Sequence, residues 1–220
     1  MRRVLGWLLT PLYHLALWLH SPGDEWEELF IHPPFWRFGP GSRHRFSWYF
    51  EGESGVTVAS LDEMLSWLGS CHYRGDKELF QEEDFWQHPR TFERLKEGDC
   101  EDFALWAWRK LTELGIPARL FIGKLVEGGQ GSTHTHAWVV FTTAGGEYLL
   151  EPAAGSREAA VRPLDEVRHL YRPHVSVDAA YRTLSYSGFM TTMQEDERRR
   201  RAFGRADFVP NVGGTAGGAS

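Results

Sequence analysis

A helix pattern that leads directly into an apolar strand pattern is the feature that most limits the fold of this chain. Apolar residues recur at helical spacing from Ala104 to Leu114, and Gly115 followed by Pro117 ends the helix. Residues 118–126 (ARLFIGKLV) then predict a buried strand. We therefore expect a helix that begins near Cys100 and packs against the sheet to which this strand belongs.

Two segments further along predict an antiparallel hairpin. Residues 134–143 (HTHAWVVFTT) and 147–152 (EYLLEP) are strand-like and flank the turn sequence Ala-Gly-Gly. A helix followed by strands that pair with their sequence neighbours is typical of the α+β class, with the helices gathered on one side of an antiparallel sheet.

Other segments predict further elements around this core. Ser60 and Glu63 form a capping box before a helix, and Pro163 lies in the first turn of a second short helix over residues 162–171. A short strand is expected around residues 45–50. Polar residues dominate beyond residue 188, and the C-terminal end (GGTAGGAS) is typical of a disordered tail.

These patterns divide the chain into three parts. Residues 1–42 form an apolar and aromatic segment of undetermined role, residues 43–188 form the main folded domain, and residues 189–220 form a polar tail. Within the first part, residues 1–20 carry two arginines before an apolar run, which fits a signal, a membrane anchor or a segment packed on the domain. A cytoplasmic location is favoured, with membrane-associated and periplasmic locations as alternatives.

Composition narrows the functional classes. The 220 residues include 24 basic and 30 acidic side chains, for a formal charge of −6, which argues against a nucleic-acid partner. Two cysteines cannot build a disulfide framework, so the thiols are expected to be reduced or reactive. Cys71 is most simply a small buried residue.

Cys100 stands at the start of the predicted helix, among carboxylates. Asp99 is the natural N-cap, Asp102 is favourable in the first turn, and Glu101 is expected to point to solvent. The helix terminus lowers a thiol pKa, but these carboxylates oppose the effect. A reactive Cys100 therefore needs an imidazolium partner from elsewhere in the chain.

His136 can supply that partner. It shares one face of its predicted strand with His134, because strand side chains alternate. If the turn holds two or four residues, paired positions sum to an odd number, and Glu151 comes within reach of the His136 ring across the ladder. Cys100, His136 and Glu151 would then be nucleophile, base and orienting carboxylate.

Two metal sites compete for the same residues. His134 and His136, with Cys100 or Glu151, have the spacing of a strand-borne zinc site, which would make the chain a zinc hydrolase. Asp99, Glu101 and Asp102 could bind Ca²⁺, although helix capping explains two of them without a metal. No cofactor is expected from these patterns, and Ca²⁺ remains an unsupported possibility.

The motif order from residue 85 to residue 155 resembles the transglutaminase-like superfamily, including the bacterial transglutaminase-like cysteine proteinases. The segments that carry the resemblance are GDCEDFALWAWRKLTELGIPARLFIGKL, HTHAWVVF and EYLLEP. One position departs from the family pattern, because Glu151 stands where Asp usually precedes the proline.

The resemblance implies a papain-like core in which Cys100 is the nucleophile, His136 the general base and Glu151 the third member. It suggests Trp86 or Gln87 as an oxyanion donor beside the Cys100 backbone N–H. The predicted site is completed by three residues expected to line or support the cleft, namely Asp99, His134 and Trp138.

The function expected from the resemblance is acyl transfer through a thioester, on a protein or peptide substrate. Hydrolysis, as in a protease or amidase, is favoured over cross-linking by a transglutaminase. A catalytically silent module that binds peptides in the same cleft is the alternative from another class.

Overall fold

The structure is a computed structural model that describes residues 15, 19, 23–32, 41–127, 129–132, 134–154 and 156–203. Its strands are β1 (Glu28–His32), β2 (His72–Tyr73), β3 (Glu97–Gly98), β4 (Ala118–Glu127), β5 (Gln130–Gly131), β6 (His136–Thr143), β7 (Gly146–Leu150), β8 (Val161–Pro163), β9 (Tyr171–Val177) and β10 (Thr183–Tyr186). Its α-helices are α2 (Leu61–Leu68), α3 (Asp76–Leu79), α4 (Pro89–Leu95), α5 (Cys100–Glu113), α6 (Arg157–Ala160), α7 (Leu164–Val167) and α8 (Ser187–Phe203). Two 3₁₀ helices, η1 (Phe46–Phe50) and η2 (Arg168–Leu170), complete the described elements.

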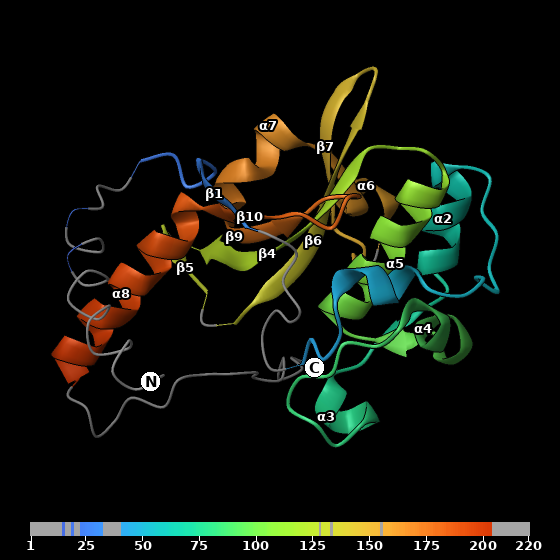
Figure 1. The fold of residues 1–220 in the computed structure, drawn as a ribbon, viewed down its shortest axis with the longest axis horizontal. Coiled ribbons are helices and arrows are strands. Elements are labelled where there is room, and N and C mark those ends of the chain that lie inside the picture. Colours follow the sequence, from blue (N-terminus) through green and yellow to red (C-terminus); the bar gives the residue numbers. More distant parts are fainter. Residues whose placement is uncertain are drawn as a thin grey trace.

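One antiparallel sheet organises the fold. Its strand order is β1-β10-β9-β4-β6-β7-β8, with β5 paired to β4. In Figure 1, helices α2, α4 and α5 lie together on the right of this sheet, while α8 lies at the far left. The predicted α+β class, with helices beside an antiparallel sheet, is therefore confirmed.

The β6–β7 hairpin has the register that a two-residue turn imposes. Val139 pairs with Leu150, and Thr143 pairs with Gly146. Paired positions therefore sum to an odd number, as predicted. The same arithmetic places position 151, one residue beyond the end of β7, across from Trp138.

Helix α5 is buried around its circumference. Every residue from Glu101 to Leu111 is buried, including Trp106 and Trp108. Gly115, at a φ of +72°, turns the chain after the helix, and the Ile116 N–H donates to the Leu111 carbonyl. The single apolar face predicted from the sequence is therefore only part of what the fold buries.

Two predicted elements take a different form. The expected strand at 45–50 is instead η1, whose backbone N–H groups donate within the turn, as from Trp48 to Arg45. Its Phe46 and Tyr49 side chains are buried in the α5 core. The expected helix at 162–171 begins as strand β8, because Pro163 pairs with Tyr148 before α7 starts.

Residues near both ends extend the sheet region. Helix α8 packs on β9, so the boundary predicted at residue 188 falls inside this helix. Strand β1 forms one edge of the sheet through its pairing with β10. Of residues 1–20 only Leu15 and Leu19 are described, and the predicted tail after residue 203 also lies outside the described residues. Among the described helices, none has the length and apolarity needed to cross a bilayer.

Candidate active site

Cys100 is the first residue of α5, at the end of the helix that faces β6. Its Sγ donates to Glu101 Oε2 at 3.2 Å, and the nearby backbone of Ala137 acts on the thiol in the direction that lowers its pKa. Burial raises the pKa of the Cys100 thiol well above its ordinary value, and the negative charges of Glu101 and Asp99 raise it further. The thiol of this structure is therefore protonated and held by Glu101.

His136 and Glu151 form a close pair at the same end of the sheet. Nε2 of His136 lies 2.6 Å from Oε2 of Glu151. Strand β6 presents His136 and Trp138 on one face, where their rings stack at 6.2 Å between centroids. Because Nε2 is engaged by the carboxylate, Nδ1 is the ring nitrogen left to accept a proton from a donor.

Ala137 connects these two parts of the site. Its side chain belongs to the core shared with α5, whereas its neighbour His136 shares the opposite face with Trp138. Within the part of the chain that the structure describes, no hydrogen bond joins the Cys100 thiol to His136. The structure thus brings Cys100 to the residue next to His136, and brings His136 to Glu151.

Five carboxylates surround the start of α5, and we call them the acidic cluster: Asp76, Asp84, Asp99, Glu101 and Asp102. Two groups within it have oxygens mutually within 4.8 Å, namely Asp76 with Asp84 and Glu101, and Asp76 with Asp99 and Asp102. Burial raises the pKa of Asp76 to about 7, with the charge of Asp99 adding to the effect.

The expectation that Glu101 points to solvent is wrong. Its side chain is only 9% exposed and accepts the Cys100 thiol proton. Burial raises the pKa of Glu101 well above its ordinary value, and the neighbouring Asp99 charge raises it further. Asp102 plays its expected part at the helix start, because its Oδ2 accepts the Asp99 backbone N–H at 3.4 Å.

The two residues suggested as oxyanion donors have their donors engaged elsewhere. The Gln87 amide nitrogen donates to the Glu97 carbonyl at 2.9 Å and to Asp102 Oδ2 at 2.5 Å. Nε1 of Trp86 donates to Asp84 Oδ1 at 2.9 Å. In this arrangement both side chains hold carboxylates of the acidic cluster, and an oxyanion would have to use other donors.

His134 lies apart from the pair and does not support the zinc alternative. Its side chain is exposed, and its backbone carbonyl accepts from Ser132 Oγ at 2.7 Å. Neither of the possible cation groups found among the described residues contains a histidine. Cys71 is half-buried, and burial raises the pKa of its thiol to about 11.

Comparison with known proteins decides the family. Residues 61–172 match the family described as bacterial transglutaminase-like cysteine proteinase (BTLCP), which spans Cys100, His136 and Glu151. The chain belongs to this family. Among curated proteins, none matches the sequence.

Three solved structures of LapG from Legionella pneumophila are similar to this chain. The EGTA-treated structure is 21% identical, covers 61% of this chain and 70% of its own, and has a TM-score of 0.42. A second LapG structure is 20% identical over 70% of this chain and 84% of its own, with a TM-score of 0.44. The calcium-bound structure is 19% identical over 68% and 86%, with a TM-score of 0.44.

Two residues that contact Glu151 or the acidic cluster were missed from the sequence. Tyr171 donates its hydroxyl to Glu151 Oε2 at 3.3 Å, from the start of β9. Asp76 is only 3% exposed and joins the acidic cluster from α3. Neither lies near a motif, because the strand order and the β2–β3 pairing that bring them in are long-range features of the fold.

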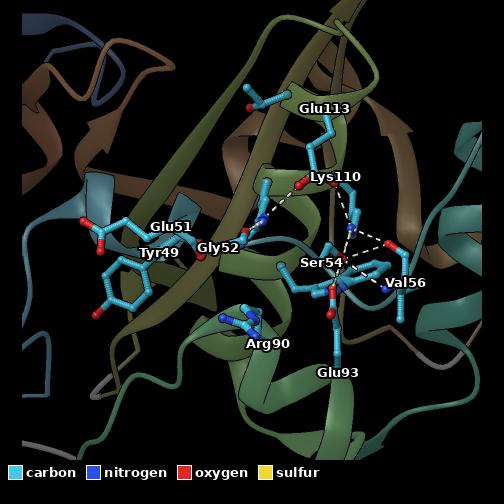
Figure 2. A network of polar contacts seen from close by, with 12 residues as sticks. Tyr49, Glu51, Gly52, Ser54, Val56, Arg90, Glu93, Lys110 and Glu113 are labelled. Atoms are coloured by element: carbon cyan, nitrogen blue, oxygen red, sulfur yellow. Dashed lines mark hydrogen bonds and ion pairs between the residues drawn. The ribbon is translucent and has the colours of Figure 1, made fainter.

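The far half of α5 carries a second polar network that fixes the helix that presents Cys100. Lys110 is fully buried, and its Nζ donates to Ser54 Oγ, to the Val56 carbonyl and to Glu113 Oε2. Figure 2 shows these contacts, with Glu93 also turned toward the ammonium group.

Arg109 extends this network to the segment that follows η1. It donates to the backbone carbonyls of Tyr49 and Gly52, and to Glu113 Oε1. Two adjacent cations on α5 therefore bind the backbone of residues 49–56 against the helix. The network therefore fixes the position of helix α5 relative to the segment that follows η1.

Proposed function

We propose that this member of the family is a thiol proteinase in which Cys100 is the nucleophile, His136 the general base and Glu151 the orienting carboxylate. One observation carries the proposal: His136 Nε2 lies 2.6 Å from Glu151 Oε2, while Ala137, the next residue, belongs to the core cluster against which Cys100 packs. An activated thiol needs a base that is itself oriented by a third group, and this pair provides both.

The proposed reaction begins with proton transfer from the Cys100 thiol to Nδ1 of His136. The thiolate attacks a peptide carbonyl carbon, and the imidazolium gives its proton to the departing amine as the C–N bond breaks. Water then loses a proton to His136 and attacks the thioester, which releases the acid and restores the thiol. Attack by a lysine amine in place of water would give cross-linking through the same residues.

In the structure without substrate, the Cys100 thiol must give up its hydrogen bond to Glu101 before it can transfer its proton. Cys100 donates to Glu101, and catalytic hydrogen bonds are often incomplete without substrate. The proposed transfer requires the Cys100 side chain to leave Glu101 and turn toward the His136 imidazole at the end of β6. The developing oxyanion would meet the Cys100 backbone N–H, since the first N–H groups of a helix have no intrahelical partner.

We propose in addition that the acidic cluster holds a divalent cation, with Ca²⁺ as the best fit. Hard carboxylate oxygens are the ligands this ion prefers. Oδ1 of Asp76, Oδ1 of Asp99 and Oε1 of Gln87 are buried without a hydrogen-bond partner, which supports a missing ligand to these oxygens. A bound cation would neutralise the charges that oppose a thiolate at Cys100.

Alkylation of Cys100 tests the nucleophile directly. A Cys71→Ser background leaves Cys100 as the one thiol, and iodoacetamide labelling is followed by mass spectrometry across pH with Ca²⁺ or with a chelator. We expect labelling faster than that of a free thiol near neutral pH, and a loss of ten-fold or more in His136→Ala. A Cys100 that labels no faster than a free thiol, with no effect of His136→Ala, would contradict the proposal.

Product analysis tests the reaction class and separates it from a silent binding module. Cell extracts treated with the wild type and with Cys100→Ala are compared for new peptide termini and new cross-links. New termini that need Cys100 support hydrolysis, and new lysine cross-links support transfer to an amine. A module that only binds would retain the same peptides in both variants and produce neither. An activity that a chelator abolishes and thiol blockers spare would support the zinc hydrolase.

A further inference from the structure

The Tyr171 side chain contacts both His136 and Glu151. Its hydroxyl donates to Glu151 Oε2 at 3.3 Å, the oxygen that also lies 2.6 Å from His136 Nε2. Its ring lies 5.1 Å from the Trp138 ring and 6.5 Å from the His136 ring between centroids. Glu151 Oε2 therefore has two hydrogen-bond partners, His136 from β6 and Tyr171 from β9.

The backbone holds Tyr171 firmly in this position. Tyr171, at the start of β9, pairs with Leu125 of β4. Its backbone carbonyl accepts a hydrogen bond from Nε1 of Trp26 at 3.0 Å. The same indole N–H also reaches the Arg168 carbonyl at 2.9 Å. The Tyr171 hydroxyl therefore reaches the Glu151 carboxylate from a strand whose backbone is held in place by these contacts.

The Tyr171 phenol is in the protonated state that a hydrogen-bond donor requires. Burial raises the pKa of the Tyr171 phenol, and the negative charge of Glu151 raises it further, so the group stays protonated at neutral pH. A carboxylate that follows the last residue of β7 has several rotamers open to it. A second donor at Oε2 selects the rotamer in which this oxygen faces the imidazole.

We propose that Tyr171 is a positioning residue that fixes the Glu151 carboxylate toward His136, and so acts on Cys100 through two intermediaries. The inference rests on the proposed function, because it assigns Tyr171 a part in the same proton transfer. The longer side chain of Glu151 makes this role stronger, since Glu has one more rotatable bond to restrain than the usual Asp.

Tyr171→Phe tests the role, because it removes the hydroxyl and keeps the ring against Trp138. In the Cys71→Ser background, we expect Cys100 alkylation near neutral pH to slow by roughly threefold to tenfold, about the net contribution of one ordinary hydrogen bond. The rising limb of the alkylation rate against pH should move to higher pH, toward the profile of Glu151→Gln. Combining Tyr171→Phe with Glu151→Gln should give no further loss.

Tyr186→Phe is the matched control. Tyr186 lies on the neighbouring strand β10, and its hydroxyl contacts a glutamate, Glu28, at 3.4 Å and Ser176 at 2.9 Å, away from the pair. This variant should lose stability without any change in the alkylation profile. Thermal unfolding of both variants measures the purely structural cost.

The outcomes separate the two proposals. A wild type whose Cys100 is activated by His136, with an unchanged profile in Tyr171→Phe, would overturn the role of Tyr171 alone. A loss in Tyr171→Phe that adds fully to that of Glu151→Gln, or that Tyr186→Phe reproduces, would also overturn it. A wild-type Cys100 no more reactive than a free thiol would overturn the proposed function and this role together.

Discussion

The two ends of α5 carry polar networks that differ in charge and in how far their hydrogen bonds are satisfied. The network at the far end is built around cations, and the network at the start consists of carboxylates. At the far end, Arg109 and Lys110 are buried and fully engaged with carbonyls and with Glu93 and Glu113. At the start, the acidic cluster gathers carboxylates with no cation among the described residues at hydrogen-bonding distance, and leaves buried oxygens unpaired. The same helix therefore ends in a satisfied network and begins in an unsatisfied one.

This difference separates a structural network from a functional one. Buried charges are tolerated when each has a partner, so the Arg109–Lys110 network contributes to a rigid fold and needs nothing more. Buried carboxylates that have no cationic partner and leave some oxygens unpaired cost stability, and proteins keep such arrangements at functional sites. Cys100 lies beside the unsatisfied end, where a change of charge would change its reactivity.

The largest effect should come from breaking the satisfied network. Lys110→Met leaves Glu93 buried at 5% side-chain exposure without its cation. We expect a loss of about 3–5 kcal/mol in the free energy of unfolding, measured by urea denaturation. Lys77→Met is the control, because its ion pair with Glu83 is well exposed and screened by solvent, so its loss should change stability far less. Equal losses of unfolding free energy in the two variants would contradict the idea that burial of the ion pair causes the loss in Lys110→Met.

The satisfied network also shows what the sequence could predict. Helix α5, strand β4 and the β6–β7 hairpin follow from local apolar patterns and from Gly115, and all were predicted. The burial of Lys110 was not, because its partners Ser54 and Val56 lie far away in the chain and carry no motif. A polar face on a helical pattern indicates solvent unless a distant segment covers it.

The candidate site divides in the same way. The contact between His136 and Glu151 was predicted, because hairpin parity is a local property of the turn. The inward direction of Glu101 and the engagement of Gln87 were not, since both depend on α3 and on the β2–β3 pairing. Charge alone predicts exposure for Glu101, whereas packing around Cys100 dictates its burial.

A smaller effect should appear in the pH dependence of the free energy of unfolding that Asp76 of the acidic cluster contributes, measured with a chelator present. Burial raises the pKa of Asp76 to about 7, above its unfolded value of 3.8, so the folded state binds an extra proton between these values. This contribution to stability is fully present below pH 3.8 and is lost as the pH rises through 7. The slope can reach about 1.4 kcal/mol per pH unit for one proton.

Urea denaturation at pH 5, 6, 7 and 8 measures this slope, and Asp76→Asn should flatten it because asparagine does not titrate. Ca²⁺ should restore stability at pH 8 in the wild type and less so in Asp76→Asn. The idea fails if the variant keeps the wild-type slope in chelator.

The smallest effect concerns the charge beside the thiol, and it compares the two ends of α5 directly. Glu101→Gln removes the negative charge that, after burial, contributes most to the raised pKa of Cys100. In chelator at neutral pH we expect Cys100 alkylation in the Cys71→Ser background to rise by roughly twofold to fivefold, since a lower thiol pKa gives more thiolate. Glu113→Gln makes the same change at the other end of the helix, where Glu113 accepts from Arg109 and Lys110, and should leave the rate unchanged. An equal rise in both variants would indicate loosening of the helix, whereas a rise in Glu101→Gln alone assigns the restraint on the thiol to the acidic end.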